Sequence, residues 1–188
     1  MANPLIALVG RPNVGKSTFF NKVAGRKISI TENRPGVTRD RLYADGEWRG
    51  KHFTMVDTGG IELKSDDVMW KEIAKQADVA IETADVILFL TDGREGLTPS
   101  DYDVADILRR SKKPVILVVN KIDEYSPDKI FEFYSLGLGE PFAVSAEHSQ
   151  GIGDVLDEAI GYFGEGETDD AERLKIAVVG KPNAGKSS

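Results

Sequence analysis

The sequence predicts an α/β fold with a mostly parallel six-stranded sheet, one antiparallel edge strand, and helices on both faces. Short apolar runs rich in Val, Ile and Leu recur along the chain, and helical patterns separate them. The runs do not alternate with polar residues, which is typical of strands covered on both faces. A phosphate-loop motif directly follows the first run. In such layered folds, ligands bind beyond the carboxyl ends of the strands.

The expected strands follow from the apolar runs, each of which has the length of one strand. These runs are residues 5–10, 52–57, 85–92, 114–120 and 141–145. A further strand is expected before 52–57, because residues 41–57 have the pattern of a β-hairpin that turns at Arg49-Gly50. This hairpin supplies the antiparallel edge strand.

The expected helices lie in the connections between these strands. One helical segment, residues 17–25, follows the phosphate loop. Ser100, with Asp103 three residues later, is typical of a helix start, and Ser126-Pro127 predicts an N-cap followed by proline at the first helical position. The face of the helix from Ser100 is expected to hold Tyr102, Ala105, Ile107 and Leu108. The face of the last helix comprises Ile152, Val155, Leu156, Ala159, Ile160 and Phe163.

Composition limits the class of protein. The 188 residues are 40% hydrophobic, enough to bury one sizeable core. With 24 basic and 31 acidic residues the net charge is −7, and no run of Lys and Arg predicts contact with DNA. Cysteine is absent, which excludes disulfides and thiolate zinc sites and fits a reducing compartment. No signal peptide and no apolar stretch of about 20 residues is present, so we expect a cytoplasmic protein without a membrane partner.

The domain organisation follows from an internal repeat. Residues 164–172, GEGETDDAE, have the composition of an acidic linker. The following LKIAVVGKPNAGKSS repeats PLIALVGRPNVGKST of the N-terminus. We therefore expect one complete domain over residues 1–163 and, over residues 173–188, the truncated start of a second, similar domain.

The phosphate-loop motif G-x-x-x-x-G-K-[ST] is met by GRPNVGKS, between a strand and a helical segment. Its two glycines allow a tight turn around an anion, and the backbone N–H groups of residues 13–18 are expected to surround the phosphates. Lys16 is expected to reach the β- and γ-phosphates, and the Ser17 hydroxyl to bind Mg²⁺. The residues expected at the nucleotide are Gly10, Arg11, Pro12, Asn13, Val14, Gly15, Lys16, Ser17 and Thr18.

A second motif, NKID, follows the apolar strand 114–120 and indicates the base. The Asp123 carboxylate can accept two hydrogen bonds from the adjacent N–H groups of guanine, a donor pair that adenine lacks. The stem of Lys121 can lie against the base plane. Ser145 and Ala146, after the next strand, can bring a backbone N–H to the guanine carbonyl oxygen. The residues expected around the base are Asn120, Lys121, Ile122, Asp123, Ser145 and Ala146.

Two further segments are expected at the γ-phosphate. The motif DTGG ends the strand 52–57, where Asp57 is placed to hold the Mg²⁺ sphere and Gly60 to bring its N–H to the phosphate. In the segment ENRPGVTRD, Thr38 is the best candidate for a second Mg²⁺ ligand that senses the γ-phosphate. The neighbouring residues expected at the nucleotide are Thr58, Gly59 and Ile61.

Taken in order, GRPNVGKS, PGVTRD, DTGG, NKID and SAE resemble the motifs of Era-like GTPases, and the repeated loop resembles the double-Era-like members of that group. The resemblance implies a Ras-like P-loop GTPase fold for residues 1–163 and Mg²⁺-dependent hydrolysis of GTP to GDP and phosphate. It also implies a role in assembly of the large ribosomal subunit. A second GTPase domain and an RNA-binding KH-like domain, neither of them within this sequence, are implied as well.

One position departs from the best-known small GTPases. Ile61 occupies the place of their water-orienting glutamine and cannot orient water. The histidines, His52 and His148, are expected at the surface. Catalysis should therefore rest on electrostatics, with Lys16, Asn13 and Thr38 as the candidate residues. Asn13 is a candidate ligand for K⁺, because relatives with asparagine at this place and no catalytic glutamine are potassium-activated, and backbone carbonyls of residues 33–39 would complete the shell.

Two other functions stay open at this point. The first is a nucleotide-gated binding module whose hydrolysis is negligible without a partner, because the glutamine is missing. The second is a P-loop kinase with a small-molecule acceptor, against which NKID and the absence of a recognisable lid segment argue.

Overall fold

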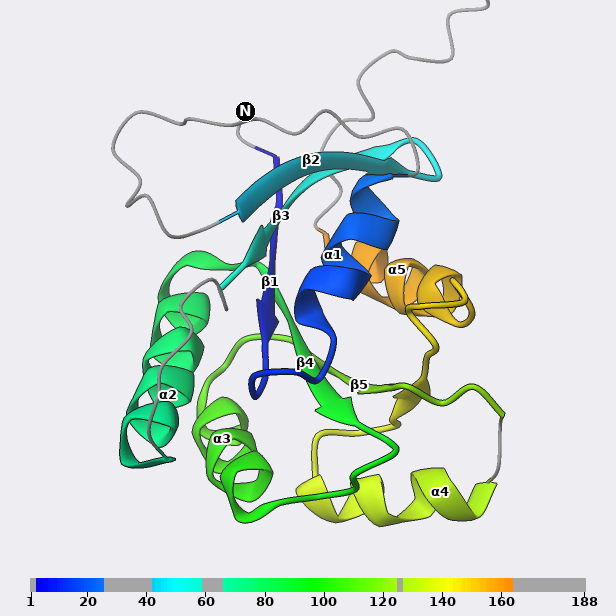
Figure 1. Cartoon of the computed structure of the whole chain (residues 1–188). Coiled ribbons are helices and arrows are strands. Elements are labelled where there is room, and N and C mark those ends of the chain that lie inside the picture. Colours follow the sequence, from blue (N-terminus) through cyan, green and yellow to red (C-terminus); the bar gives the residue numbers. More distant parts are fainter. Residues whose placement is uncertain (1–2, 26–41, 59–65, 125–126, 164–188) are drawn as a thin grey trace, which may run out of the picture.

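The computed structural model describes residues 3–25, 42–58, 66–124 and 127–163. A six-stranded sheet in the order β2-β3-β1-β4-β5-β6 forms the middle layer, and helices cover both of its faces (Figure 1). The strands are β1 (Leu5–Val9), β2 (Leu42–Trp48), β3 (Lys51–Asp57), β4 (Val86–Asp92), β5 (Val115–Asn120) and β6 (Phe142–Ala143). All pairs are parallel except β2 with β3. The predicted fold class is confirmed.

The hairpin between β2 and β3 turns where the sequence predicts. Arg49 and Gly50 both have positive φ, 48° and 79°. Two-residue turns of this kind match the right-handed twist of the strands they connect. The resulting edge strand, β2, is the only antiparallel neighbour in the described part of the sheet.

The helices separate into two layers. They are α1 (Lys16–Ala24), α2 (Asp66–Thr83), α3 (Pro99–Arg110), α4 (Pro127–Phe131) with the 3₁₀ turn η1 (Glu132–Leu136), and α5 (Ile152–Gly161). In Figure 1, α1 and α5 lie on one side of the sheet and α2 and α3 on the other. Buried side chains of α1 and α5 pack with Ile6 and Leu8 of β1, while those of α2, α3 and η1 pack with Ala7 and Val9. The four consecutive residues from Ile6 to Val9 are therefore all buried, which explains why this strand is a continuous apolar run.

The predicted start of α3 is wrong by two residues. Thr98 is extended, with φ −117° and ψ 162°, Pro99 takes the first helical position, and Asp101 accepts hydrogen bonds of 2.9 Å from both the N–H and the hydroxyl of Thr98. This capping box replaces the one expected from Ser100 and Asp103.

The buried face of α3 also differs from the predicted one. It comprises Asp101, Val104, Ala105 and Leu108, whereas the predicted core residue Tyr102 is 45% exposed and Ile107 is only partly buried. An earlier start does not move a helix face by itself. The buried carboxylate of Asp101 decides this one, because it belongs to an ion pair described below.

The other helix predictions fare better. The six residues predicted on the face of α5 are all buried. Helix α4 begins at Pro127 as predicted, although its expected cap, Ser126, lies outside the described residues. Strand β6 is shorter than predicted, and Ser145, two residues after its end, forms an isolated bridge with Gln150.

The linker 164–172 and the repeat 173–188 also lie outside the described residues. Within the described part of the chain, no helix is long and apolar enough to cross a bilayer.

Candidate functional site

The phosphate loop joins β1 to α1 and contains the backbone conformations that its glycines allow. Gly10 and Gly15 have φ of 155° and 96°, in the region that side chains rarely adopt. A Cβ on Gly10 would lie 2.3 Å from the Leu90 carbonyl oxygen, and one on Gly15 would lie 2.3 Å from the Asn120 side chain. Gly15 is also the N-cap of α1 and provides no side-chain cap, so the first N–H groups of the helix face the loop.

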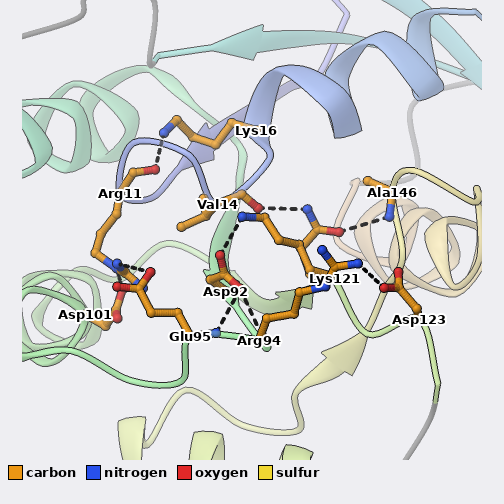
Figure 2. Close-up of polar contacts among 11 residues, drawn as sticks. Arg11, Val14, Lys16, Asp92, Arg94, Glu95, Asp101, Lys121, Asp123 and Ala146 are labelled. Carbon is orange, nitrogen blue, oxygen red and sulfur yellow. Dashed lines mark hydrogen bonds and ion pairs between the residues drawn. The ribbon is translucent and has the colours of Figure 1, made fainter.

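Lys16 begins α1 and folds back over the loop. Its Nζ donates to the carbonyl oxygens of Gly10 and Arg11, each at 2.7 Å, and Figure 2 shows the bond to Arg11. The residue is only 6% exposed, and burial lowers the pKa of Lys16 to about 8. At neutral pH the ammonium is still mostly charged, so a buried cation stands inside the phosphate loop.

The hydroxyl of Ser17 donates to Asp57 Oδ2 at 2.9 Å, at the point where β3 ends. The next residue, Thr58, fixes this end of the strand by donating to the Leu8 carbonyl at 2.5 Å. A hydroxyl and a carboxylate are the hard oxygen ligands that Mg²⁺ prefers. Among the described residues, no cluster of three or more His, Asp or Glu side chains could hold a metal ion without help. The donor set therefore fits Mg²⁺ that takes its other ligands from phosphates and water.

The end of β5 is joined to the phosphate loop and to the segment after β6 by one side chain. Asn120 Nδ2 donates to the Val14 carbonyl at 2.8 Å, and Asn120 Oδ1 accepts from the Ala146 N–H at 3.0 Å. Asn120 is 2% exposed, so both bonds are shielded from water. Three loops far apart in the sequence are thereby held in register.

Asp123 lies beside this junction. Its Oδ1 accepts from the Ser145 hydroxyl at 2.8 Å, and its Oδ2 accepts from Arg94 Nη2 (Figure 2). The ion pair with Arg94, and then the hydrogen bond from Ser145, lower the pKa of Asp123, so it is ionised at neutral pH. His148 Nε2 lies 3.8 Å from Oδ1.

A cavity of about 410 Å³ opens between this carboxylate and the phosphate loop. Its lining comprises Gly15, Thr18, Arg94, Asn120, Lys121, Asp123, Ser145 and Glu147. The volume is within the range of small-molecule sites. Four of the predicted base-binding residues, a phosphate-loop glycine and the first turn of α1 thus face one space.

Lys121 crosses to the end of β4. Its Nζ donates to Asp92 Oδ2 at 2.6 Å. Burial alone would raise the pKa of Asp92, but the hydrogen bonds from Lys121 and from the N–H groups of Arg94 and Glu95 outweigh burial and lower it. The stem of Lys121 is consequently fixed along the cavity wall.

The described residues include most of the predicted site. Gly10 to Thr18, Asp57, Thr58, Asn120 to Asp123, Ser145 and Ala146 lie along one edge of the sheet, at the carboxyl ends of β1, β3, β5 and β6. Thr38, Gly59, Gly60 and Ile61 lie outside the described residues, as does the segment 33–39. His52 and His148 are exposed, as predicted.

The sequence reasoning missed Asp92 and Arg94. Asp92 is the last residue of β4 and Arg94 follows it by two positions, in TDGREG, so both stand at the carboxyl edge where ligands bind. That position was the available signal. The residue types gave no further hint, because an aspartate and an arginine after a strand are common in exposed loops.

Arg11 ties the phosphate loop to α3. Its Nε donates to Asp101 Oδ1 at 3.0 Å and its Nη1 to Glu95 Oε2 at 3.1 Å (Figure 2). Asp101 is fully buried, and Nη2 of Arg11 is buried without a hydrogen-bond partner among the described residues. This ion pair explains why a carboxylate occupies the core face of α3.

Replacing Arg11 by methionine is expected to lower the free energy of unfolding by about 3–5 kcal/mol, because the change leaves the buried charge of Asp101 without its cation. Chemical denaturation measures this loss. The matched control is Arg109→Met, since Arg109 pairs with Asp106 on the surface of the same helix and exposed pairs contribute little. Equal stability of the two variants would contradict the assignment.

A comparison with family models matches residues 5–121 to the 50S ribosome-binding GTPases. Among curated proteins, the chain is 56% identical over 191 residues to GTPase Der of Clostridium perfringens (strain SM101) and to GTPase Der of Clostridium botulinum (strain Hall). Each alignment covers 100% of this chain and 44% of the relative. The chain thus spans less than half the length of these relatives.

Solved structures with the same fold include relatives with bound nucleotide. An Era variant of Aquifex aeolicus bound to GDP and AlF4⁻ has a TM-score of 0.69 at 32% identity, covering 89% of this chain and 59% of that chain. Era in complex with MgGDPNP and nucleotides 1506–1542 of 16S ribosomal RNA has a TM-score of 0.66 at 34% identity, with the same coverage. The G domain of the T. maritima FeoB iron transporter has a TM-score of 0.60 at 29% identity, covering 85% of this chain and 98% of that chain.

Proposed function

Because this chain belongs to the family of 50S ribosome-binding GTPases, we propose that it binds GTP and GDP and hydrolyses GTP. One observation carries the proposal. The cavity has the phosphate loop at one end and the ionised carboxylate of Asp123 at the other, with Asn120 bonded to both the loop and the Ala146 backbone. A nucleotide that spans the cavity would place its phosphates at the phosphate loop and its base at Asp123.

The base end suits guanine. Guanine presents two adjacent N–H donors, and Asp123 is an acceptor already oriented by Ser145. Adenine would leave this carboxylate without its donors, which costs roughly 1–3 kcal/mol. A P-loop kinase for ATP is therefore the weaker alternative.

The phosphate end supplies positive charge and N–H donors. Lys16, held by two loop carbonyls, would contact the β- and γ-phosphates, and the N–H groups of residues 13–18 would donate to the phosphate oxygens. Ser17 and Asp57 would hold Mg²⁺, which when bound draws negative charge from the phosphates. Thr38 is the proposed third residue that would hold Mg²⁺. Negative charge that builds up on the β–γ bridging oxygen as GDP leaves would thus be stabilised by Lys16 and by the N–H groups of the loop.

Calorimetric titration of the chain with GDP, GTP and ATP tests the binding proposal. We expect GDP and GTP to bind and ATP to bind much more weakly, whereas equal affinity for ATP and GTP would overturn it. Single-turnover cleavage of GTP then separates a hydrolase from a nucleotide-gated binding module. GTP that stays intact in the bound state over hours would favour the module.

Potassium is proposed as an activator. Asn13 is exposed in the loop with φ 64°, a conformation that asparagine tolerates, and its amide oxygen is a neutral ligand beside the expected phosphate position. We expect hydrolysis to be about tenfold faster in KCl than in NaCl of equal concentration, a smaller gain than the ~10³–10⁵ that an arginine finger gives.

The measurement is GTP turnover in the two salts for the natural chain and for Asn13→Ala. The variant should lose the difference between the salts and keep its affinity for GDP. Equal rates in the two salts for the natural chain would remove K⁺ from the mechanism.

A role in assembly of the large ribosomal subunit is the proposed setting of this activity. The description of the family and the rRNA bound to Era support it. The chain itself carries a net charge of −7, so its own surface offers little general attraction to RNA. Cosedimentation with 50S subunits in GDP and in a non-hydrolysable GTP analogue tests the proposal, and binding in neither state would argue against a direct role for this part of the protein.

A further inference from the structure

Arg94 forms an ion pair with Asp123, the carboxylate that the proposed function assigns to guanine. In Figure 2 its side chain runs past Lys121 and directs its guanidinium toward Asp123. The contact joins Arg94 Nη2 to Asp123 Oδ2, while Ser145 holds Oδ1. Both residues of the ion pair line the cavity, and the Arg94 side chain is 60% exposed. Each oxygen of Asp123 therefore has a donor from within the chain.

The backbone that carries Arg94 is held firmly beside the site. Asp92 Oδ1 accepts from the N–H groups of Arg94 and Glu95 at 2.9 and 3.2 Å. The intervening Gly93 packs so closely that a Cβ would lie 2.3 Å from the Ile122 side chain. The backbone of Arg94 is thus held against the loop that carries Asp123, whereas its long side chain can change rotamer.

The chemistry of the two donors is the same. The N1–C2–N2 fragment of guanine is a guanidine built into a ring, and it presents adjacent N–H groups in one plane. Arginine presents its N–H groups in a planar fork that also matches a carboxylate. An aspartate that selects guanine from among the bases is consequently also a good partner for a guanidinium.

We propose that Arg94 is an internal competitor of guanine: it pairs with Asp123 in the vacant pocket and has to swing away when the base binds. This inference rests on the proposed guanine site. The competition lowers the apparent affinity for guanine nucleotides by the fraction of time that Asp123 is paired. The same pairing would balance the negative charge of Asp123 whenever guanine is not bound to it.

The expected effect is modest, because an exposed ion pair is weak and is screened by salt. Replacing Arg94 by glutamine should tighten GDP binding by about two- to fivefold. The gain should shrink between low and high ionic strength, as the pair in the natural chain is itself weakened. ADP should not bind more tightly to this variant, because adenine has no pair of N–H donors for Asp123.

The experiment displaces a fluorescent GDP analogue with GDP, or with ADP up to millimolar concentration, at two ionic strengths. It compares the natural chain with Arg94→Gln and with the control Arg49→Gln. Arg49 forms a similar exposed pair with Asp157 at 2.6 Å, remote from the cavity lining. The control removes the same charge and should leave both affinities unchanged.

Tighter GDP binding in Arg94→Gln, confined to GDP and reduced by salt, would support the competition. Unchanged or weaker GDP binding would overturn it, and so would an equal gain for ADP, since that gain would come from a wider cavity. If the natural chain binds no GDP at all, the proposed function fails and the competition fails with it. The two failures are therefore distinguishable.

Discussion

Replacing Asp123 by asparagine is expected to reverse the base preference from guanine to xanthine. Asparagine places an amide N–H₂ where guanine presents its own amino group, so two donors oppose each other. Xanthine carries a carbonyl oxygen at this place and accepts the amide. With one hydrogen bond lost and one donor left buried, we expect GDP affinity to fall about 10²-fold, and xanthosine diphosphate to become the better ligand.

Competition between GDP and xanthosine diphosphate measures this reversal. The matched control is Asp78→Asn, which removes the same charge from an exposed position on α2. Its base preference should match that of the natural chain. If Asp123→Asn still favours GDP over the xanthine nucleotide, Asp123 does not contact the base edge, and the assignment of the cavity to guanine is wrong.

Replacing Lys16 by alanine is expected to lower the rate of GTP hydrolysis by about 10²–10³-fold, the usual cost of removing one preorganised donor from a charged transition state. Lys16 is positioned for this role by the carbonyl oxygens of Gly10 and Arg11, which hold its Nζ inside the loop. Alanine has no charged group, so the variant lacks this cation at the phosphates.

Single-turnover hydrolysis, with the protein in excess over GTP and well above the Kd, is the measurement, because it separates the chemical step from weaker binding. Lys22→Ala is the control, since Lys22 is an exposed lysine on the same helix. The prediction is contradicted if Lys16→Ala cleaves bound GTP at the rate of the control.

The sequence predicted the order of strands and helices because the signals for them are local. Buried parallel strands are continuous apolar runs, and the turn at Arg49-Gly50 sits between two strand patterns. The start of α3 was missed because two overlapping cap signals stand side by side. The choice between them depends on Arg11, a residue distant in sequence that pairs with Asp101 in the core.

The candidate site divides in the same way. The phosphate loop and the segment around Asp123 were found as contiguous motifs. Arg94 and Asp92 were not found, because their role exists only through contacts with Asp123 and Lys121, which lie on the next loop along the sheet edge. Pairings of this kind have no period and no motif, so a single sequence does not reveal them.

The position of β1 has a consequence for synthesis of the chain. It precedes the other five strands of the sheet in the chain, yet among the described residues it is an inner strand whose neighbours are β3 and β4. Until those segments leave the ribosome, an apolar strand with two unpaired edges is exposed to wrong partners. The phosphate loop obtains its contacts later still, because Gly10 packs against Leu90 and Gly15 packs against Asn120, at the end of β5. Nascent chains that end before Asn120 should therefore need a chaperone's protection, and nucleotide cannot rescue them by binding early.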